Sequence, residues 1–170
     1  MRVRPQWVMG RGSFIQYNRK LLGYDMKQLQ VKLLRSNARL PESKTSGSVG
    51  YDVAACLSEP VDIDPGETKM VGSGFSIALE QGYAAFVFAR SGLGINHGIV
   101  PANCVGVIDS DYRGEIIVGL KNTSGKPFRV NDGDRIAQMV IVRCEKPELC
   151  LSGELCETQR GSGGFGSTGK

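Results

Sequence analysis

The chain has 170 residues, which is the length of one domain with a substantial hydrophobic core. Hydrophobic residues make up 41% and charged residues 22%, proportions that exclude a disordered or collagen-like chain. The net charge of +4 comes from residues 1–25, which carry five basic residues and one acidic residue, whereas the remainder has 16 of each.

Residues 1–25 show no strand periodicity, although they contain Trp7, the only tryptophan. They lack a long Lys/Arg run or a basic amphipathic helix, so we interpret them as a disordered, solvated extension that binds neither nucleic acid nor membrane. The periodic part opens at Met26, and a true start at Met26 is a hypothesis. No stretch approaches the ~18–20 apolar residues that span a bilayer, and no secretory signal is visible.

Short apolar or alternating runs follow from residue 29 onward, separated by turn residues at 64–66, 81–82, 123–127 and 131–134. They predict strands near residues 29–34, 52–56, 61–63, 75–79, 83–88, 105–108, 115–120 and 136–142. No helical stripe of ten or more residues is present, which disfavours a parallel βαβ arrangement. The expected fold is all-β, a sandwich or jelly-roll-like barrel over residues 26–158.

Residues 103–116 (NCVGVIDSDYRGEI) have apolar runs on both sides of a polar turn and predict a β-hairpin. Asp109 would lie at its mouth, where a carboxylate can accept a proton from water. The alternative is that Asp109 and Asp111 only cap the turn.

Residues 159–170 are rich in glycine and predict a flexible arm rather than part of the core. The five cysteines form no CxxC pair, so free thiols in a reducing cytoplasm are the simplest interpretation.

The third motif of the trimeric dUTPases resembles residues 106–116. Four further segments resemble the other motifs of that family in the family's order: residues 50–55 (GYDVAA), 90–94 (RSGLG), 133–139 (GDRIAQM) and 160–169. The order is more specific than any single match. The chain departs from common family forms at Ala89, where proline is usual, and at Tyr51, which is often aliphatic.

The resemblance implies a dUTPase-like (β-clip) barrel that forms a homotrimer with exchange of C-terminal arms. It implies hydrolysis of dUTP to dUMP and pyrophosphate by water attack on the α-phosphorus, activated by Asp109. Such an enzyme keeps uracil out of DNA and supplies dUMP for thymidylate synthesis. Mg²⁺ would be held by substrate phosphates and water, without a direct protein ligand.

By resemblance, uracil is read by backbone groups around Cys104, Val107, Ile108 and Ile117, and Asn103 holds the loop. The ring of Tyr112 would lie against deoxyribose and exclude a 2′-hydroxyl. Phosphates would contact Arg90, Ser91 and Gly92, with Gln138 positioning phosphate or water. From the arm, the expected substrate contacts are Arg160, Phe165, Gly166, Ser167 and Thr168.

Several of these assignments have a purely structural alternative. Tyr112 could pack on its own turn, Gln138 could be an ordinary strand residue, and the arm could be a disordered tail with an incidental aromatic residue. Asp52 is expected to act through its neighbours or through structure, without a catalytic role. His97, the only histidine, is expected to be a satisfied loop residue.

Two rival functions remain from the sequence. A dCTP deaminase shares the fold but relies on a glutamate near residues 107–109 and a second arginine soon after the RS pair, and neither is present. A nucleotide-responsive regulator could use the same scaffold to bind a protein partner.

Overall fold

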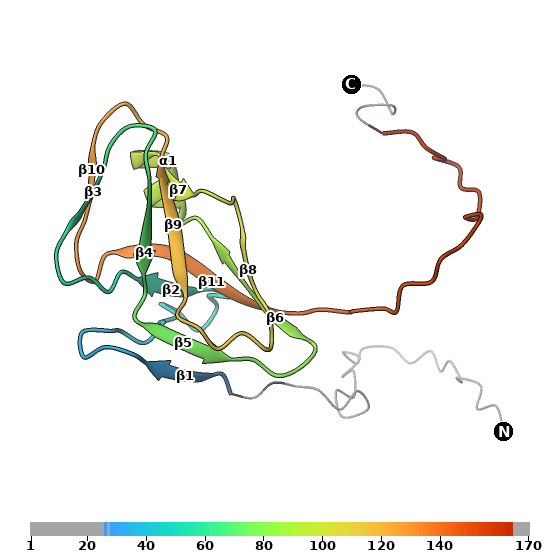
Figure 1. The fold of residues 1–170 in the computed structure, drawn as a ribbon, viewed down its shortest axis with the longest axis horizontal. Helices are drawn as coiled ribbons and strands as arrows, with labels where there is room; N and C mark the ends of the chain where they lie inside the picture. The colour runs from blue at the N-terminus through green and yellow to red at the C-terminus, as the bar shows by residue number, and fades with distance from the viewer. Residues whose placement is uncertain (1–25, 27, 165–170) are drawn as a thin grey trace, which may run out of the picture.

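The structure is a computed structural model and describes residue 26 and residues 28–164. Within that range the chain is almost entirely β (Figure 1), with one short helix, α1 (Ser91–His97). In chain order the strands are β1 (Gln30–Leu33), β2 (Tyr51–Ala54), β3 (Val61–Ile63), β4 (Thr68–Gly72), β5 (Phe75–Ala78), β6 (Tyr83–Phe88), β7 (Ile99–Pro101), β8 (Gly106–Ile108), β9 (Ile117–Asn122), β10 (Phe128–Val130) and β11 (Arg135–Arg143).

The strands form short antiparallel sheets that wrap around one core as a jelly-roll-like barrel (Figure 1). The largest sheet has the order β2-β11-β6-β8, and a second has the order β4-β9-β7. The pairs β1-β5 and β3-β10 complete the described sheets. The nine-residue strand β11 pairs with β2 on one side and β6 on the other, and therefore joins segments that are far apart in the sequence.

The core follows from the alternation of side chains along the strands. On β9, Val118, Leu120 and Asn122 are buried, whereas Ile117 and Lys121 face outward. Asn122 is fully buried because its amide is satisfied: Nδ2 donates to the carbonyls of Ile63 and Lys126, and Oδ1 accepts from Ser124. The buried side chains of β9 therefore pack into the core of the barrel, and the hydrogen bonds of Asn122 hold the 123–127 turn in place.

All eight predicted strands are present, with ends that differ by at most two residues. Strands β4, β7 and β10 and helix α1 were not predicted. Gly98 ends α1 in the left-handed conformation, with φ 68°, and its N–H donates to the carbonyls of Leu93 and Gly94.

The predicted β-hairpin at residues 103–116 is wrong. Its two strands do not pair with each other: β8 pairs with β6, and β9 pairs with β4 and β7. The segment between them is a loop that crosses from one sheet to the other, because each strand finds its hydrogen-bond partners in a different sheet.

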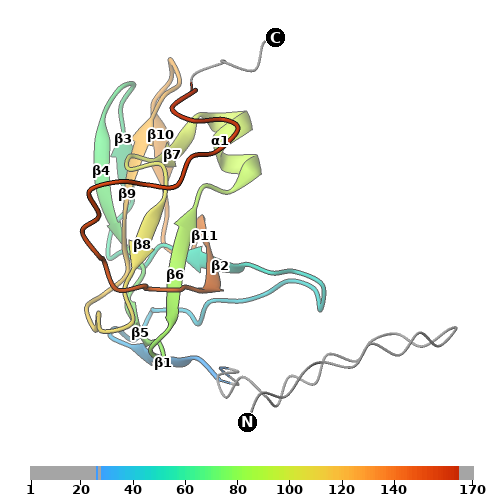
Figure 2. The same ribbon diagram turned by 90° about the vertical axis from the view of Figure 1, so that its right-hand side faces the viewer.

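The described part of the C-terminal segment leaves the barrel after β11 (Figures 1 and 2). Leu149, Leu151 and Leu155 along this segment are 95%, 101% and 89% exposed. The five cysteines are free thiols, and Cys56 alone among them is buried. The one helix in the described residues is far too short and polar to cross a bilayer.

Candidate active site

Asp109 directly follows β8 and is exposed. It lies on an open hollow of about 850 Å³, which Asp111, Arg113, Tyr83 and Lys146 also line. An exposed carboxylate at a concave surface with nearby cations can hold a water molecule beside an anionic ligand. The geometry thus gives Asp109 access to solvent and to a bound molecule.

Strand β8 is the edge strand of its sheet, and no described strand pairs with its outer edge. Val107 on β8 is 58% exposed and Ile117 at the start of β9 is 49% exposed. Strand β7 pairs with β9 as far as Leu120. One further hydrogen bond lies on the same side of β9, from Ala102 N–H to the Gly119 carbonyl. The segment therefore offers unpaired strand edges with apolar side chains, which suits a flat polar ring read by backbone groups.

A tight turn leads into β8. Cys104 has a φ of 63°, unusual for a residue with a side chain, and its N–H donates to the Pro101 carbonyl at 3.0 Å. The Asn103 carbonyl accepts from Val105 N–H at 2.7 Å. Gly106 comes next, and a Cβ there would lie only 3.2 Å from the Cβ of Val87 on β6. Asn103 and Cys104 thus set where β8 begins, while their side chains stay exposed.

The ring of Tyr112 lies over Gly114, where any side chain would overlap it. Its hydroxyl donates to the carbonyl of Glu115 at 3.0 Å, and the residue is 43% exposed. The Arg113 guanidinium donates to the carbonyls of Ser110 and Tyr112. In this structure Tyr112 therefore packs on its own loop, and part of its side chain stays exposed.

A second cluster of functional side chains joins β2, β11 and the start of α1. Arg90 Nε donates to Asp52 Oδ1 at 2.9 Å, and Arg135 Nη1 donates to Asp52 Oδ2 at 3.0 Å. The side chains of Asp52 and Arg90 are 16% and 26% exposed. Asp52 therefore fixes the guanidinium of Arg90, a charge-assisted arrangement that the sequence alone did not reveal.

Gln138 on β11 lies in the same cluster, opposite Asp52 on β2 and Phe88 on β6. Its amide donates to the carbonyl of Ala89 at 2.9 Å, directly before Arg90. Ser91 and Gly92 open helix α1 and are exposed. The cluster thus presents a hydroxyl and an unobstructed amide beside a guanidinium held in place. Such groups can bind phosphate oxygens.

The two clusters lie at opposite ends of β6, the strand that leads into helix α1 (Figure 2). Ile108 pairs with Ala85, so Asp109 lies beside Ala84, whereas Arg90 follows the other end of the strand. The six steps from Ala84 to Arg90 advance about 3.3 Å each, or roughly 20 Å in all. Within one chain, Asp109 and Ser91 are therefore too far apart to act on neighbouring phosphates.

Two residues named from the sequence belong to neither cluster. His97 ends α1, is exposed, and packs its ring against Phe128 with centroids 5.3 Å apart. Arg160 lies in the exposed C-terminal segment, where its Nε donates to the Gly163 carbonyl at 2.9 Å. Phe165, Gly166, Ser167 and Thr168 lie outside the described residues.

Glu115 is not among the site residues predicted from the sequence. Its carboxylate accepts two hydrogen bonds from Arg35, at 2.6 and 2.7 Å, and one from Gly74 N–H at 2.7 Å. The hydrogen bonds from Arg35 lower the pKa of Glu115, with Gly74 adding to the effect and partial burial opposing it. Long-range contacts of this kind leave no periodic signal in a sequence.

Comparison with known proteins identifies the family of the chain. The dUTPase family profile matches residues 36–169. The deoxyuridine 5'-triphosphate nucleotidohydrolase of Polynucleobacter asymbioticus is 46% identical over 148 residues, which cover 85% of this chain and 99% of the relative.

Solved structures are similar over most of the chain. The dUTPase of Staphylococcus bacteriophage 80alpha, solved with dUPNHPP, has a TM-score of 0.79 and 30% identity and covers 85% of this chain and 99% of its own. A mutant dUTPase from phage phi11 of S. aureus, described with a structural Mg(II) ion, has a TM-score of 0.70 and 27% identity, with 75% and 98% covered. The profile match and the curated relative together settle the assignment: this chain belongs to the dUTPase family.

Proposed function

We propose that this chain hydrolyses dUTP to dUMP and pyrophosphate, with Asp109 as the general base. The observation that carries the proposal is the exposed carboxylate of Asp109 at the end of an unpaired strand edge, in a chain whose curated relatives are dUTP nucleotidohydrolases. Asp109 takes a proton from a water molecule as the water oxygen attacks the α-phosphorus, and pyrophosphate leaves. General-base catalysis of this kind contributes about 10²–10⁴-fold.

Selectivity for uracil would come from the backbone of β8 and the start of β9. Val107, Ile108 and Ile117 supply strand-edge N–H and C=O groups, and the turn at Asn103 holds β8 in position. Cytosine carries an amino donor where uracil has an acceptor, so a fixed backbone pattern leaves buried groups unpaired and rejects it. The exposed part of the Tyr112 side chain would face deoxyribose and leave no space for a 2′-hydroxyl.

The triphosphate would contact the second cluster. Arg90 offers a guanidinium held by Asp52, Ser91 a hydroxyl, and Gly92 an amide without a side chain in front of it. Gln138 fixes the chain at Ala89 and would position phosphate or water. These groups bind and orient the phosphates that leave as pyrophosphate.

The distance of roughly 20 Å along β6 supports a shared active site. If Asp109 and Ser91 act on one triphosphate, they must come from different chains. We therefore place the loop of residues 109–114 from one subunit beside Arg90 of a second, in a homotrimer. The exposed leucines after β11 are consistent with an arm, residues 159–170, that covers the site of another subunit.

Mg²⁺ is the expected cofactor, and when bound it would neutralise charge on the phosphate oxygens. Both carboxylate oxygens of Asp52 already accept hydrogen bonds from arginines, so Asp52 is not a free ligand. We propose that the ion is carried by substrate phosphates and water, without a direct protein ligand.

Pyrophosphate release measured with dUTP, UTP, dCTP and dTTP tests the proposal. We expect release from dUTP alone, loss of turnover in Asp109→Asn, and unchanged turnover in Asp62→Asn, an exposed carboxylate on β3. Near-normal turnover of Asp109→Asn would show that another base acts. Ammonia release from dCTP would assign a deaminase instead, and dUTP binding without hydrolysis would favour a regulator.

A further inference from the structure

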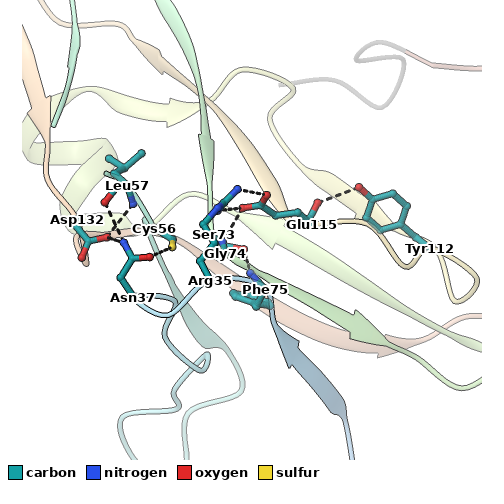
Figure 3. Close-up of polar contacts among 10 residues, drawn as sticks. All are labelled: Arg35, Asn37, Cys56, Leu57, Ser73, Gly74, Phe75, Tyr112, Glu115 and Asp132. Atoms are coloured by element: carbon teal, nitrogen blue, oxygen red, sulfur yellow. Dashed lines mark hydrogen bonds and ion pairs between the residues drawn. The ribbon is translucent and has the colours of Figure 1, made fainter. Parts of the chain in front are cut away.

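An ion pair outside both clusters connects the end of the loop of residues 109–114 to the N-terminal part of the barrel (Figure 3). Arg35, two residues after β1, forms a bidentate pair with Glu115, directly after the loop of residues 109–114. Bidentate pairs of guanidinium and carboxylate fix orientation as well as distance. The side chain of Glu115 is only 15% exposed, so the pair is partly shielded from solvent.

The same segment is anchored by its backbone to the turn between β4 and β5. Gly74 N–H donates to Glu115 Oε1 at 2.7 Å, Ser73 N–H donates to the Ile116 carbonyl at 3.0 Å, and Ile116 N–H donates to the Phe75 carbonyl at 2.9 Å. A side chain at Gly72 would overlap the Glu115 carboxylate. The fold therefore contains a site shaped for the glutamate side chain.

Tyr112 depends on this anchor. Its hydroxyl donates to the carbonyl of Glu115 at 3.0 Å (Figure 3), and its ring lies against Gly114, the residue before Glu115. A shift of Glu115 would move both the acceptor of the hydroxyl and the surface under the ring. The guanidinium of Arg35 therefore acts on the tyrosine through one residue.

We propose that the Arg35–Glu115 pair is a positioning element for Tyr112 and thereby sets the discrimination between 2′-deoxyribose and ribose. The inference rests on the proposed function, in which the Tyr112 ring excludes the 2′-hydroxyl. Neither Arg35 nor Glu115 touches the substrate in this proposal. Their role is to hold the ring at a position that leaves no space for the 2′-hydroxyl oxygen. A small displacement of the ring would open that space.

The test is a comparison of kcat/KM for dUTP and UTP in wild type, Arg35→Met and Glu115→Gln. We expect the dUTP:UTP ratio to fall about tenfold in both variants, because misplacement by about 1 Å is enough to change rates strongly. We expect kcat for dUTP to change far less than the ratio. The matched control, Arg129→Met, removes an exposed bidentate arginine that pairs with Asp62, and its ratio should equal that of wild type.

A double-mutant cycle with Tyr112→Phe separates positioning from general structural damage. That substitution removes the hydroxyl donor but keeps the contact of the ring with Gly114, so Arg35→Met should lower the ratio less in the Tyr112→Phe background than in the wild-type background. An equal fall of the ratio in both backgrounds would overturn the route through the Tyr112 hydroxyl. The side chain of Arg35 is 47% exposed, so we expect Arg35→Met to fold even if Glu115→Gln does not.

The two proposals fail in different ways. If wild type does not hydrolyse dUTP, the proposed function is wrong. If wild type hydrolyses dUTP and discriminates against UTP, but folded Arg35→Met has the same ratio, only the role of the Arg35–Glu115 pair is refuted.

Discussion

Replacing Asp52 by asparagine tests whether this carboxylate organises the proposed phosphate-binding cluster. The substitution keeps the shape of the side chain but removes the charge that Arg90 and Arg135 share. It leaves one neutral acceptor for Arg90 and places an amide N–H group where Arg135 needs an oxygen. Arg90 is then free to swing away from the position that its partner imposed.

The size of the effect follows from the exposure of each partner. Hydrogen bonds to charged groups contribute about 1.5–3 kcal/mol, and the Arg90 bond, between side chains 26% and 16% exposed, belongs near the low end of that range. The Arg135 side chain is 46% exposed, so solvent screening reduces its bond to about 0.5 kcal/mol. The sum is about 2 kcal/mol, which lowers the melting temperature by roughly 4–8 °C for a domain of this size.

Calorimetric melting at fixed protein concentration and dUTP hydrolysis measure the two consequences. We expect kcat/KM for dUTP to fall about tenfold to thirtyfold in Asp52→Asn, as a loss of about 1.4–2 kcal/mol in transition-state binding requires. Asp62→Asn, which breaks a well-exposed bidentate pair, should leave both quantities nearly unchanged. The reasoning is refuted if Asp52→Asn melts within about 1 °C of wild type and retains full activity.

Four further outcomes follow from the structure. Asp109→Asn should lower kcat by about 10²–10⁴-fold without changing the melting temperature, because its side chain is exposed; a large loss of stability would instead indicate a structural role. Removing residues 160–170 should abolish hydrolysis while the circular dichroism spectrum and the melting temperature stay as in wild type, since residues 160–162 and 164 are exposed and residue 163 is only partly buried. Unaffected hydrolysis would exclude a role of the arm in the reaction. Gly74→Ala should destabilise the fold by at least about 1–3 kcal/mol in urea unfolding, because φ is 71° and the added methyl would collide with Cys56. The pKa of Glu115 is lowered in the folded state, so its stabilising effect is complete above the ordinary value of 4.5 and is lost as the pH falls through the folded value. Arg35→Met should therefore cost less stability at about pH 3 than at about pH 7. An equal cost at both pH values would contradict a stabilising Arg35–Glu115 pair.

The sequence predicts the strands whose pattern is local. The alternation of buried and exposed residues on β9 and the apolar run of β6 are visible without any partner. Strands β7 and β10 have three residues each and were missed, whereas β3 and β8, of the same length, were predicted from the alternating residues before the turn at 64–66 and from the apolar run at 105–108. Helix α1 was missed because two of its seven residues are glycines, which intrinsic propensity disfavours, and its end depends on Gly98.

The candidate site divides in the same way. Asp109, Tyr112 and Arg90 stand in local motifs, so they were found by their resemblance to a family. The contacts of Asp52 with Arg135 and of Arg35 with Glu115 join residues 80 or more positions apart, and only the fold brings them together. The hairpin prediction was wrong for a related reason: strand pairing is decided between sheets, and neighbouring strands in sequence carry no mark of it.

The length of β6 has a genetic consequence. Because Asp109 and Ser91 lie at opposite ends of that strand, a lesion at one and a lesion at the other damage different parts of the proposed shared sites. Two chains, each inactive alone, would rebuild an intact site when they assemble together. Alleles with defects at the two ends should therefore complement each other in one cell, whereas two alleles with defects at the same end should not.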